Sequence, residues 1–176
     1  MKASLLTLLI LIFTMSVNAQ DTDFKLLEEG LTDYIVVQVD SLKSSNQYSK
    51  CIEWIGKTYR DPSEVIKSKV ENTSVRIEGV VEGLIKAGGV SFDTRYQVEI
   101  SFRDGRFKFD VLNLETYSVQ MGWTQFPVGE WREYFKNGQL KRSWINLGDI
   151  PLYFNNLSSS LKKYILEVSS PENEKW

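Results

Sequence analysis

Histidine is absent from the 176-residue chain. This absence excludes Ser-His-Asp and Cys-His nucleophile systems, acid–base catalysis by histidine, and most zinc and copper sites. Cys51 is the only cysteine, so an intramolecular disulfide is excluded and the domain must be stable through its core alone. Because no catalytic motif is present either, we expect a protein that is not an enzyme and that holds no cofactor.

The chain also lacks an excess of basic residues. It has 21 Lys and Arg against 23 Asp and Glu, a net charge of −2. Because nucleic-acid binding normally needs a basic surface, we expect no nucleic-acid partner. Hydrophobic residues make up 42% of the chain, which is enough for a core. After the apolar run near the N-terminus, no second apolar run is long enough to span a membrane.

Residues 1–19 have the pattern of an export signal. Lys2 is followed by a nearly unbroken apolar run over residues 3–15, and Val17 and Ala19 place small residues at the −3 and −1 positions. The run is too short to cross a bilayer comfortably. We therefore expect cleavage between Ala19 and Gln20, and a mature chain that is periplasmic or extracellular.

The rest of the chain has the length of one domain. We expect an acidic leader over residues 20–33, a single α+β domain over residues 34–168, and a loose tail over residues 169–176. Within the domain, residues 34–39 are β-branched and predict a buried strand. Residues 47–59 predict a helix.

That first helix has an apolar stripe made of Tyr48, Ile52, Ile55 and Tyr59. Cys51 lies beside the stripe on the same helix, where we expect it to be buried and unreactive. A short strand should follow at Val65-Ile66.

The middle of the chain alternates apolar and polar residues, as a half-buried strand does, from residue 75 to residue 85 and again from residue 96. Asp104-Gly105 is a strong signal for a two-residue hairpin turn. This turn fixes the pairing of the strands on either side of it, with Phe102 opposite Phe107, Ile100 opposite Phe109 and Val98 opposite Val111 on one face. Arg103 then lies opposite Arg106, and the polar face places Ser101 opposite Lys108 and Glu99 opposite Asp110.

Residues 117–147 form an aromatic-rich insertion before the last helix. Asn137-Gly138 predicts a second hairpin turn inside it, between residues 131 and 146. The last helix should begin at Asp149 and carry an apolar stripe of Ile150, Phe154, Leu157, Leu161, Tyr164, Ile165 and Val168. The predicted order is β-α-β-β-β-β-α, an antiparallel sheet with both helices on one face.

This order and three local sequences resemble a family of exported bacterial proteins that have a domain of unknown function with a TATA-binding-protein-like fold. The sequences are Tyr48-Ser-Lys-Cys-Ile-Glu-Trp54, Tyr59-Arg-Asp-Pro-Ser-Glu-Val-Ile66 and Phe102-Arg-Asp-Gly-Arg-Phe107. The resemblance implies that fold and export, but it implies no activity, no catalytic residues and no DNA binding. Residues 129–140 resemble a single MORN-type repeat, although a plain hairpin explains the same residues, because such repeats need stacked neighbours.

Two sets of residues are candidate sites. Glu99 and Asp110 are like charges on adjacent strands, which a solvated surface explains and which a divalent cation or an acid–base pair would also use. The aromatic insertion supplies the stronger candidates for ligand or partner binding, unless they only cover the core: Trp123, Trp131, Tyr134 and Trp144. Asp40-Ser41-Leu42 also matches a short bacterial O-glycosylation triplet.

We therefore expect a non-catalytic binding or interaction module of the cell envelope, whose partner is an envelope protein, a peptide or a glycan. The alternatives are a structural envelope component without a ligand and a carboxylate-based hydrolase. Exposed aromatic side chains beside a groove would favour the binding module, and a carboxyl pair buried in a pocket would favour the hydrolase.

Overall fold

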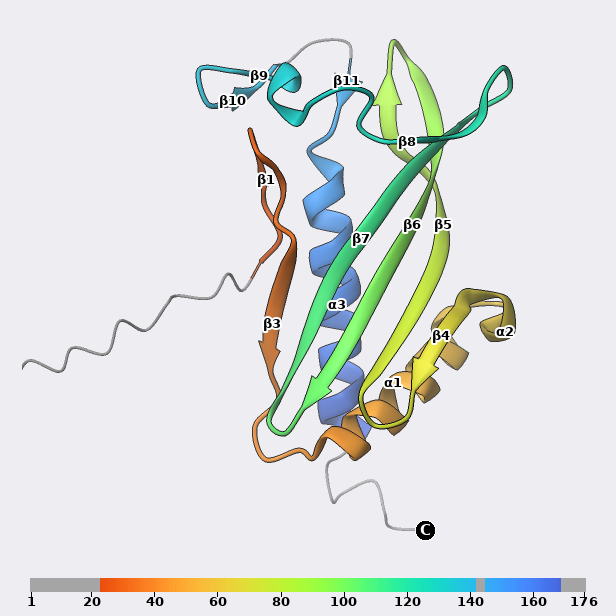
Figure 1. Cartoon of the computed structure of the whole chain (residues 1–176), viewed down its shortest axis with the longest axis vertical. Helices are drawn as coiled ribbons and strands as arrows, with labels where there is room; N and C mark the ends of the chain where they lie inside the picture. The colour runs from red at the N-terminus through yellow and green to blue at the C-terminus, as the bar shows by residue number, and fades with distance from the viewer. Residues whose placement is uncertain (1–22, 142–144, 169–176) are drawn as a thin grey trace, which may run out of the picture.

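The computed structural model describes residues 23–141 and 145–168 (Figure 1). The predicted signal peptide, the Ala19–Gln20 cleavage site, Trp144 and the predicted tail lie outside the described residues. The described residues form an antiparallel sheet with two long helices on one of its faces, so the predicted α+β architecture is confirmed.

The main sheet has seven strands, and its central path runs in the order β11-β5-β6-β7-β3. Two further strands extend its sides, because β4 pairs with β5 and β8 pairs with β7. The strands of this sheet are β3 (Tyr34–Gln38), β4 (Ile66–Val70), β5 (Ser74–Ala87), β6 (Val90–Arg103), β7 (Arg106–Ser118), β8 (Gly122–Gln125) and β11 (Ile145–Asn146).

The pairing of β6 with β7 confirms the register that the Asp104-Gly105 turn predicts. Phe102 lies opposite Phe107, Ile100 opposite Phe109 and Val98 opposite Val111. All of these side chains except that of Val111, which is partly buried, lie in the core. Beyond Val98 the register shifts, since Gln97 pairs with Asn113 and leaves Leu112 as a bulge.

Two helices, α1 (Ser44–Thr58) and α3 (Asp149–Val168), cover the same face of the sheet, with α3 running along its length (Figure 1). A four-residue helix, α2 (Pro62–Val65), leads into β4. The stripe predicted for α3 is confirmed in its described side chains, since five of them are buried: Ile150, Phe154, Leu157, Leu161 and Ile165.

The stripe predicted for α1 is rotated in the structure. Gln47, Cys51, Trp54 and Ile55 are the buried residues of this helix, whereas Tyr48, Ile52 and Tyr59 only pack against the edge of the core. The rotation brings α1 against α3, where the indole Nε1 of Trp54 donates a hydrogen bond of 3.1 Å to Ser160 Oγ. Cys51 is fully buried, as predicted, and this burial raises the pKa of its thiol.

The residues of the predicted leader that the structure describes pack as part of the domain. They form a small hairpin of β1 (Leu26–Leu27) and β2 (Gly30–Leu31). Phe24 is 2% exposed, and its ring centroid lies 6.0 Å from that of Phe109 and 5.9 Å from that of Phe154. The packed domain therefore begins before residue 34, because an apolar side chain of the acidic segment completes the core.

The aromatic-rich insertion contains little regular structure. After β8 come a single 3-10 turn, η1 (Trp131–Tyr134), and a short hairpin of β9 (Phe135–Lys136) and β10 (Gln139–Leu140). Asn137 and Gly138 form the turn of this hairpin with positive φ angles, as their sequence predicts. The hairpin is shorter than the predicted span of residues 131–146, because residues 131–134 form the 3-10 turn η1 and do not pair as a strand.

A cluster of tyrosines fills the space between the sheet and the helices. The hydroxyl of Tyr96 lies 2.8 Å from that of Tyr59 and accepts a hydrogen bond of 3.0 Å from that of Tyr153. The ring of Tyr96 passes under Gly79 of the neighbouring strand, where an added Cβ would lie 2.4 Å from the Tyr96 hydroxyl and 2.5 Å from its ring. The sheet therefore needs a glycine at residue 79.

We expect Gly79→Ala to lower the free energy of unfolding by about 1–3 kcal/mol, because the added methyl group must displace a buried ring. The matched control is Gly56→Ala in α1, where nothing lies within 4 Å of the added Cβ. That change should stabilise the protein by about 0.5–1 kcal/mol. Urea unfolding of both variants measures the difference, and equal free energies of unfolding would contradict this account of Gly79.

Candidate ligand-binding surface

The sheet face away from the helices is polar and carries cross-strand ion pairs. Arg76 contacts Glu99 at 2.8 Å, and Arg95 contacts Glu115 at 2.6 Å. The hydrogen bond from Arg95 to Glu115 raises the pKa of the Arg95 guanidinium. These pairs are partly exposed, so each contributes little to stability.

Glu99 and Asp110 lie opposite each other, as the hairpin register predicts. Each has its own cation, because Arg76 donates to Glu99 and Lys108 donates to Asp110 at 2.6 Å. Among the residues that the structure describes, no three or more metal-ligating side chains gather into a group. These partners favour the explanation of the two carboxylates as a solvated, ion-paired surface.

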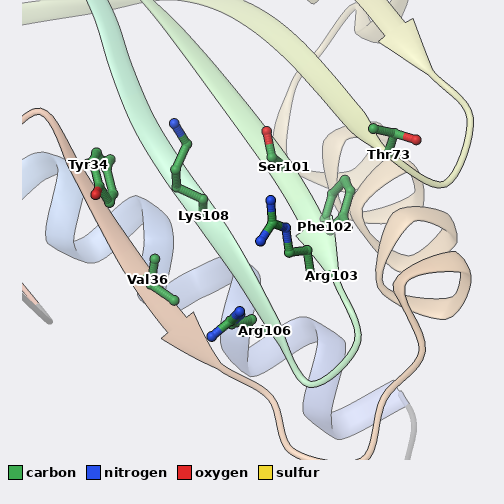
Figure 2. Close-up of a pocket in the computed structure, with 8 residues that line it drawn as sticks. All are labelled: Tyr34, Val36, Thr73, Ser101, Phe102, Arg103, Arg106 and Lys108. Atoms are coloured by element: carbon green, nitrogen blue, oxygen red, sulfur yellow. The ribbon is translucent and has the colours of Figure 1, made fainter. Parts of the chain in front are cut away.

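A hollow of about 600 Å³ lies on this face where the β6–β7 hairpin meets β3 (Figure 2). Its lining residues come from three neighbouring strands and from the turn before β5: Tyr34, Val36, Thr73, Ser101, Phe102, Arg103, Arg106 and Lys108. We call it the basic hollow, because this lining includes three cations and no carboxylate.

The two arginines of the basic hollow lie directly opposite each other. Arg103 pairs with Arg106 across the Asp104-Gly105 turn, and both side chains are exposed. Like charges opposite each other on adjacent strands destabilise a sheet by up to about 1 kcal/mol. Lys108 is held by Asp110, but within the described part of the chain no ion pair forms at either arginine. The basic hollow therefore keeps an uncompensated positive charge.

Strand β3 supplies an apolar wall beside these cations. It pairs with β7 so that Tyr34 lies opposite Asp110, Val36 opposite Lys108 and Gln38 opposite Arg106. The ammonium group of Lys108 lies 4.8 Å from the centroid of the Tyr34 ring, a cation–π contact. The site thus combines positive charge with an exposed aromatic side chain.

The hairpin that carries the arginines is attached to the start of α1. The carboxylate of Asp104 accepts a hydrogen bond of 2.8 Å from the backbone N–H of Ser44. Gln47 Nε2 donates to the carbonyls of Arg103 at 2.8 Å and Leu42 at 2.9 Å. These bonds hold the backbone of the basic hollow in place before any ligand arrives.

The aromatic candidates of the insertion do not come together in one site. Trp123 packs on Tyr117 with ring centroids 5.4 Å apart, and Arg95 lies 4.6 Å from its ring centroid. Trp131 and Tyr134 belong to a different group and pack against Phe126. The described aromatic side chains of the insertion therefore fall into separate groups, and Trp131 and Tyr134 line two different hollows.

Trp131 also packs against the β1–β2 hairpin. Its indole ring lies against Gly30, where an added Cβ would be 3.1 Å from the ring. A hollow of about 210 Å³ lies between this region and the bulge of β7. Tyr134 donates a hydrogen bond of 3.1 Å to the carbonyl of Val128, so its hydroxyl is already used.

The residues of the basic hollow were not among the predicted site residues. The opposition of Arg103 and Arg106 follows from the Asp104-Gly105 turn, and a pair of like charges at a hairpin end is a signal that sequence alone contains. The contribution of Tyr34 and Val36 depends on the pairing of β3 with β7, which joins segments far apart in the chain. Asp40 and Ser41, of the predicted glycosylation triplet, are exposed after β3.

None of the helices in the described residues is long and apolar enough to span a membrane. No protein-family model and no curated protein matches the sequence. Solved structures do match. A DUF4468 family protein from Bacteroides ovatus superposes with a TM-score of 0.56 at 9% identity, over 81% of this chain and 88% of that one.

A TBP-like protein from Parabacteroides distasonis superposes with a TM-score of 0.55 at 12% identity, over 75% of this chain and 90% of that one. At such low identity a likeness in structure establishes the fold and not the function. The predicted resemblance is confirmed at that level: the chain has the TATA-binding-protein-like α+β fold that is found in a bacterial domain of unknown function.

Proposed function

We propose that the protein is a non-catalytic, exported binding module of the cell envelope, and that its basic hollow binds the oxyanion groups of a partner. The observation that carries this proposal is the placement of Arg103, Arg106 and Lys108 around one hollow whose lining has no carboxylate. The pattern of residues 1–19 supports the location outside the cytoplasm.

The chemistry of the hollow suits carboxylate, sulfate or phosphate groups. A guanidinium group is planar and donates paired hydrogen bonds to two oxygens of one such group, and it is always charged. Bringing an oxyanion between Arg103 and Arg106 would also relieve their mutual repulsion. The hydroxyl of Ser101 adds a neutral donor between the two strands.

Binding explains the hollow better than catalysis does. Its lining has no carboxylate or thiol that could act as a general base or a nucleophile, and its arginines stay protonated. A carboxylate-based hydrolase would need a protected pair of acids, whereas Glu99 and Asp110 lie on an open face and are ion-paired. A structural component without a ligand would give no reason for two arginines at one place that form no ion pair with any described residue.

Small polyanions test the proposal. Calorimetric titration of the protein, purified after expression of the full chain, with citrate and with tripolyphosphate should show saturable binding that weakens as salt is added. The double variant R103Q/R106Q should bind at least about tenfold more weakly, since both bidentate donors are lost.

The matched control removes the same charge from the opposite layer of the molecule. Lys162 and Lys163 are exposed on α3, so K162Q/K163Q has the same net charge as R103Q/R106Q. It should bind both polyanions as the unchanged protein does. Equal weakening in the two double variants would mean that net charge alone causes binding, and no saturation by about 10 mM would disprove the basic hollow as a site.

A further inference from the structure

We propose that the free edge of β3 binds an extended acidic peptide as an additional strand of the sheet, with its carboxylates over the basic hollow. This inference rests on the proposed function, because it names the class of partner that the hollow would recognise. Recognition by strand addition uses main-chain hydrogen bonds for affinity and alternate side chains for specificity.

Strand β3 is the last strand of the main sheet on its side. Among the residues that the structure describes it pairs with β7 alone, and Figure 1 shows no described helix or strand on its other side. Its five residues, Tyr-Ile-Val-Val-Gln, contain no proline, glycine or charge, and its register with β7 has no bulge. Proline, charged side chains and bulges usually protect an edge strand from pairing with a further strand. Because β3 has none of them, its edge is open to pairing.

The backbone of β3 presents its free groups at regular intervals. In an antiparallel pair, alternate residues exchange both hydrogen bonds with the partner strand. The carbonyl of Asp33 accepts from the N–H of Val111, and the N–H of Val39 donates to the carbonyl of Gly105. By the same alternation, the N–H and C=O groups of Ile35 and Val37 point toward β7. The N–H and C=O groups of the intervening residues therefore point away from the sheet.

These intervening residues are Tyr34, Val36 and Gln38, and they also belong to the face of the basic hollow. Their side chains project to the side opposite Ile35 and Val39, which are buried in the core. Figure 2 shows Tyr34 and Val36 beside Lys108 and Arg106 on this face. A strand added to β3 would thus place every second side chain next to these cations.

The spacing of strands makes this contact geometrically reasonable. An added strand would lie about 4.8 Å beyond β3, and so about 10 Å from the backbone of β7. A glutamate side chain from the new strand and the long side chain of Arg106 can meet over Val36, which is small enough to leave space between them. The partner that fits is therefore an extended peptide with acidic residues at alternate positions.

A second copy of this chain is the competing occupant of the edge. Pairing β3 with β3 of another molecule would bring two basic hollows onto one continuous face, where their arginines and lysines would repel each other. An acidic peptide instead compensates the charge. Charge complementarity thus favours the peptide.

The probe is a fluorescent peptide of alternating glutamate and valine. Fluorescence anisotropy measures its binding to the protein purified after expression of the full chain. In an antiparallel added strand, the glutamates over the hollow are also the residues whose N–H groups face β3. A matched peptide with N-methylated glutamates therefore keeps every charge but loses those N–H groups. We expect the unmodified peptide to bind and the N-methylated peptide to bind at least about tenfold more weakly.

A variant of the protein tests the main-chain hydrogen bonds that β3 itself would donate to the peptide. Val36→Pro removes an N–H that points away from β7, so no hydrogen bond within the sheet is lost. Val36→Thr keeps that N–H and a β-branched side chain, and it serves as the control. Because Val36 also lines the hollow, V36T measures what a changed side chain alone costs. Peptide binding should be at least about tenfold weaker in V36P than in V36T, while citrate and tripolyphosphate should bind the two variants alike.

The results separate the two proposals. If V36P and the N-methylated peptide retain full binding while R103Q/R106Q loses it, strand addition is wrong and the basic hollow remains an anion site. If neither polyanions nor the peptide depend on Arg103 and Arg106, the proposed function itself fails. A dimer in sedimentation experiments that V36P abolishes would assign the edge to a second copy and overturn the inference. If V36P does not fold, as circular dichroism would show, the N-methylated peptide decides the question alone.

Discussion

Raising the pH above about 10 is expected to unfold this protein steeply. Burial raises the pKa of Cys51, Tyr59, Tyr96 and Tyr153 above their ordinary values of 9.0 for the thiol and 10.0 for the phenols. In the unfolded chain these groups ionise at their ordinary pKa, whereas the folded protein keeps their protons. The stability present below the ordinary pKa is therefore lost as the pH rises, by about 1.4 kcal/mol per pH unit for each group.

Tyr153 is partly exposed, so solvent reduces its share, and the four groups together would remove about 4–5 kcal/mol per pH unit once the pH exceeds 10. A typical domain has about 5–15 kcal/mol of stability, so we expect unfolding to be complete within about one to three pH units. Urea titrations at about pH 8, 9.5 and 10.5, together with tyrosinate absorbance, measure the slope. The absorbance change should coincide with unfolding because the buried phenols ionise only when the core opens.

Tyr153→Phe supplies the control for this pH dependence. It removes one of the four titrating groups and the hydrogen bond to the hydroxyl of Tyr96, but it keeps the aromatic ring. The slope above pH 10 should become smaller by up to about one quarter, because Tyr153 is the least buried of the four groups. A free energy of unfolding that is the same at about pH 8 and 10.5 would show that the tyrosine cluster does not act as a buried, protonated unit.

The second large effect is expected from Phe24→Ala, which should lower the free energy of unfolding by about 3–5 kcal/mol. Phe24 is 2% exposed and packs between Phe109 of the sheet and Phe154 of α3. Its removal leaves a cavity between the two layers. Urea unfolding, followed by far-ultraviolet circular dichroism, measures the loss.

Leu27→Ala is the matched control for Phe24→Ala. Leu27 belongs to the same N-terminal segment, but 49% of it is exposed. Its truncation should change stability by less than about 1 kcal/mol. Similar effects of the two substitutions would mean that residues 23–33 do not complete the core.

The sheet of this protein could be predicted from sequence where the signals are local. The Asp104-Gly105 turn fixes the register of two strands, because a shift of one residue would place every phenylalanine of the hairpin on the polar face. The same turn predicts that Glu99 lies opposite Asp110 and Arg103 opposite Arg106, as the structure has them. The terminal helix is similarly predictable, since its apolar residues recur at helical spacing over many turns.

The rest depends on contacts between distant residues. The side of α1 that is buried is set by its contact with α3, where Trp54 meets Ser160, and the periodicity of α1 alone places the stripe on a neighbouring side. The carboxylate of Asp104, from a turn 60 residues further along the chain, bonds the first N–H of α1 in place of a local cap. The basic hollow needs the pairing of β3 with β7 in addition to the hairpin, so local patterns could supply only half of it.

The bonds between Phe24 and Asn155 join parts of the chain that are 131 residues apart. The side chain of Asn155 accepts from the N–H of Phe24 and donates to its carbonyl, so the first described turn of the chain is anchored to its last helix. While the chain is being synthesised, the part of the apolar face that α3 covers therefore stays exposed until α3 has left the ribosome. The core of this domain can therefore close only after every residue from Phe24 to α3 has been synthesised, which couples the completion of folding to the two ends of the described chain.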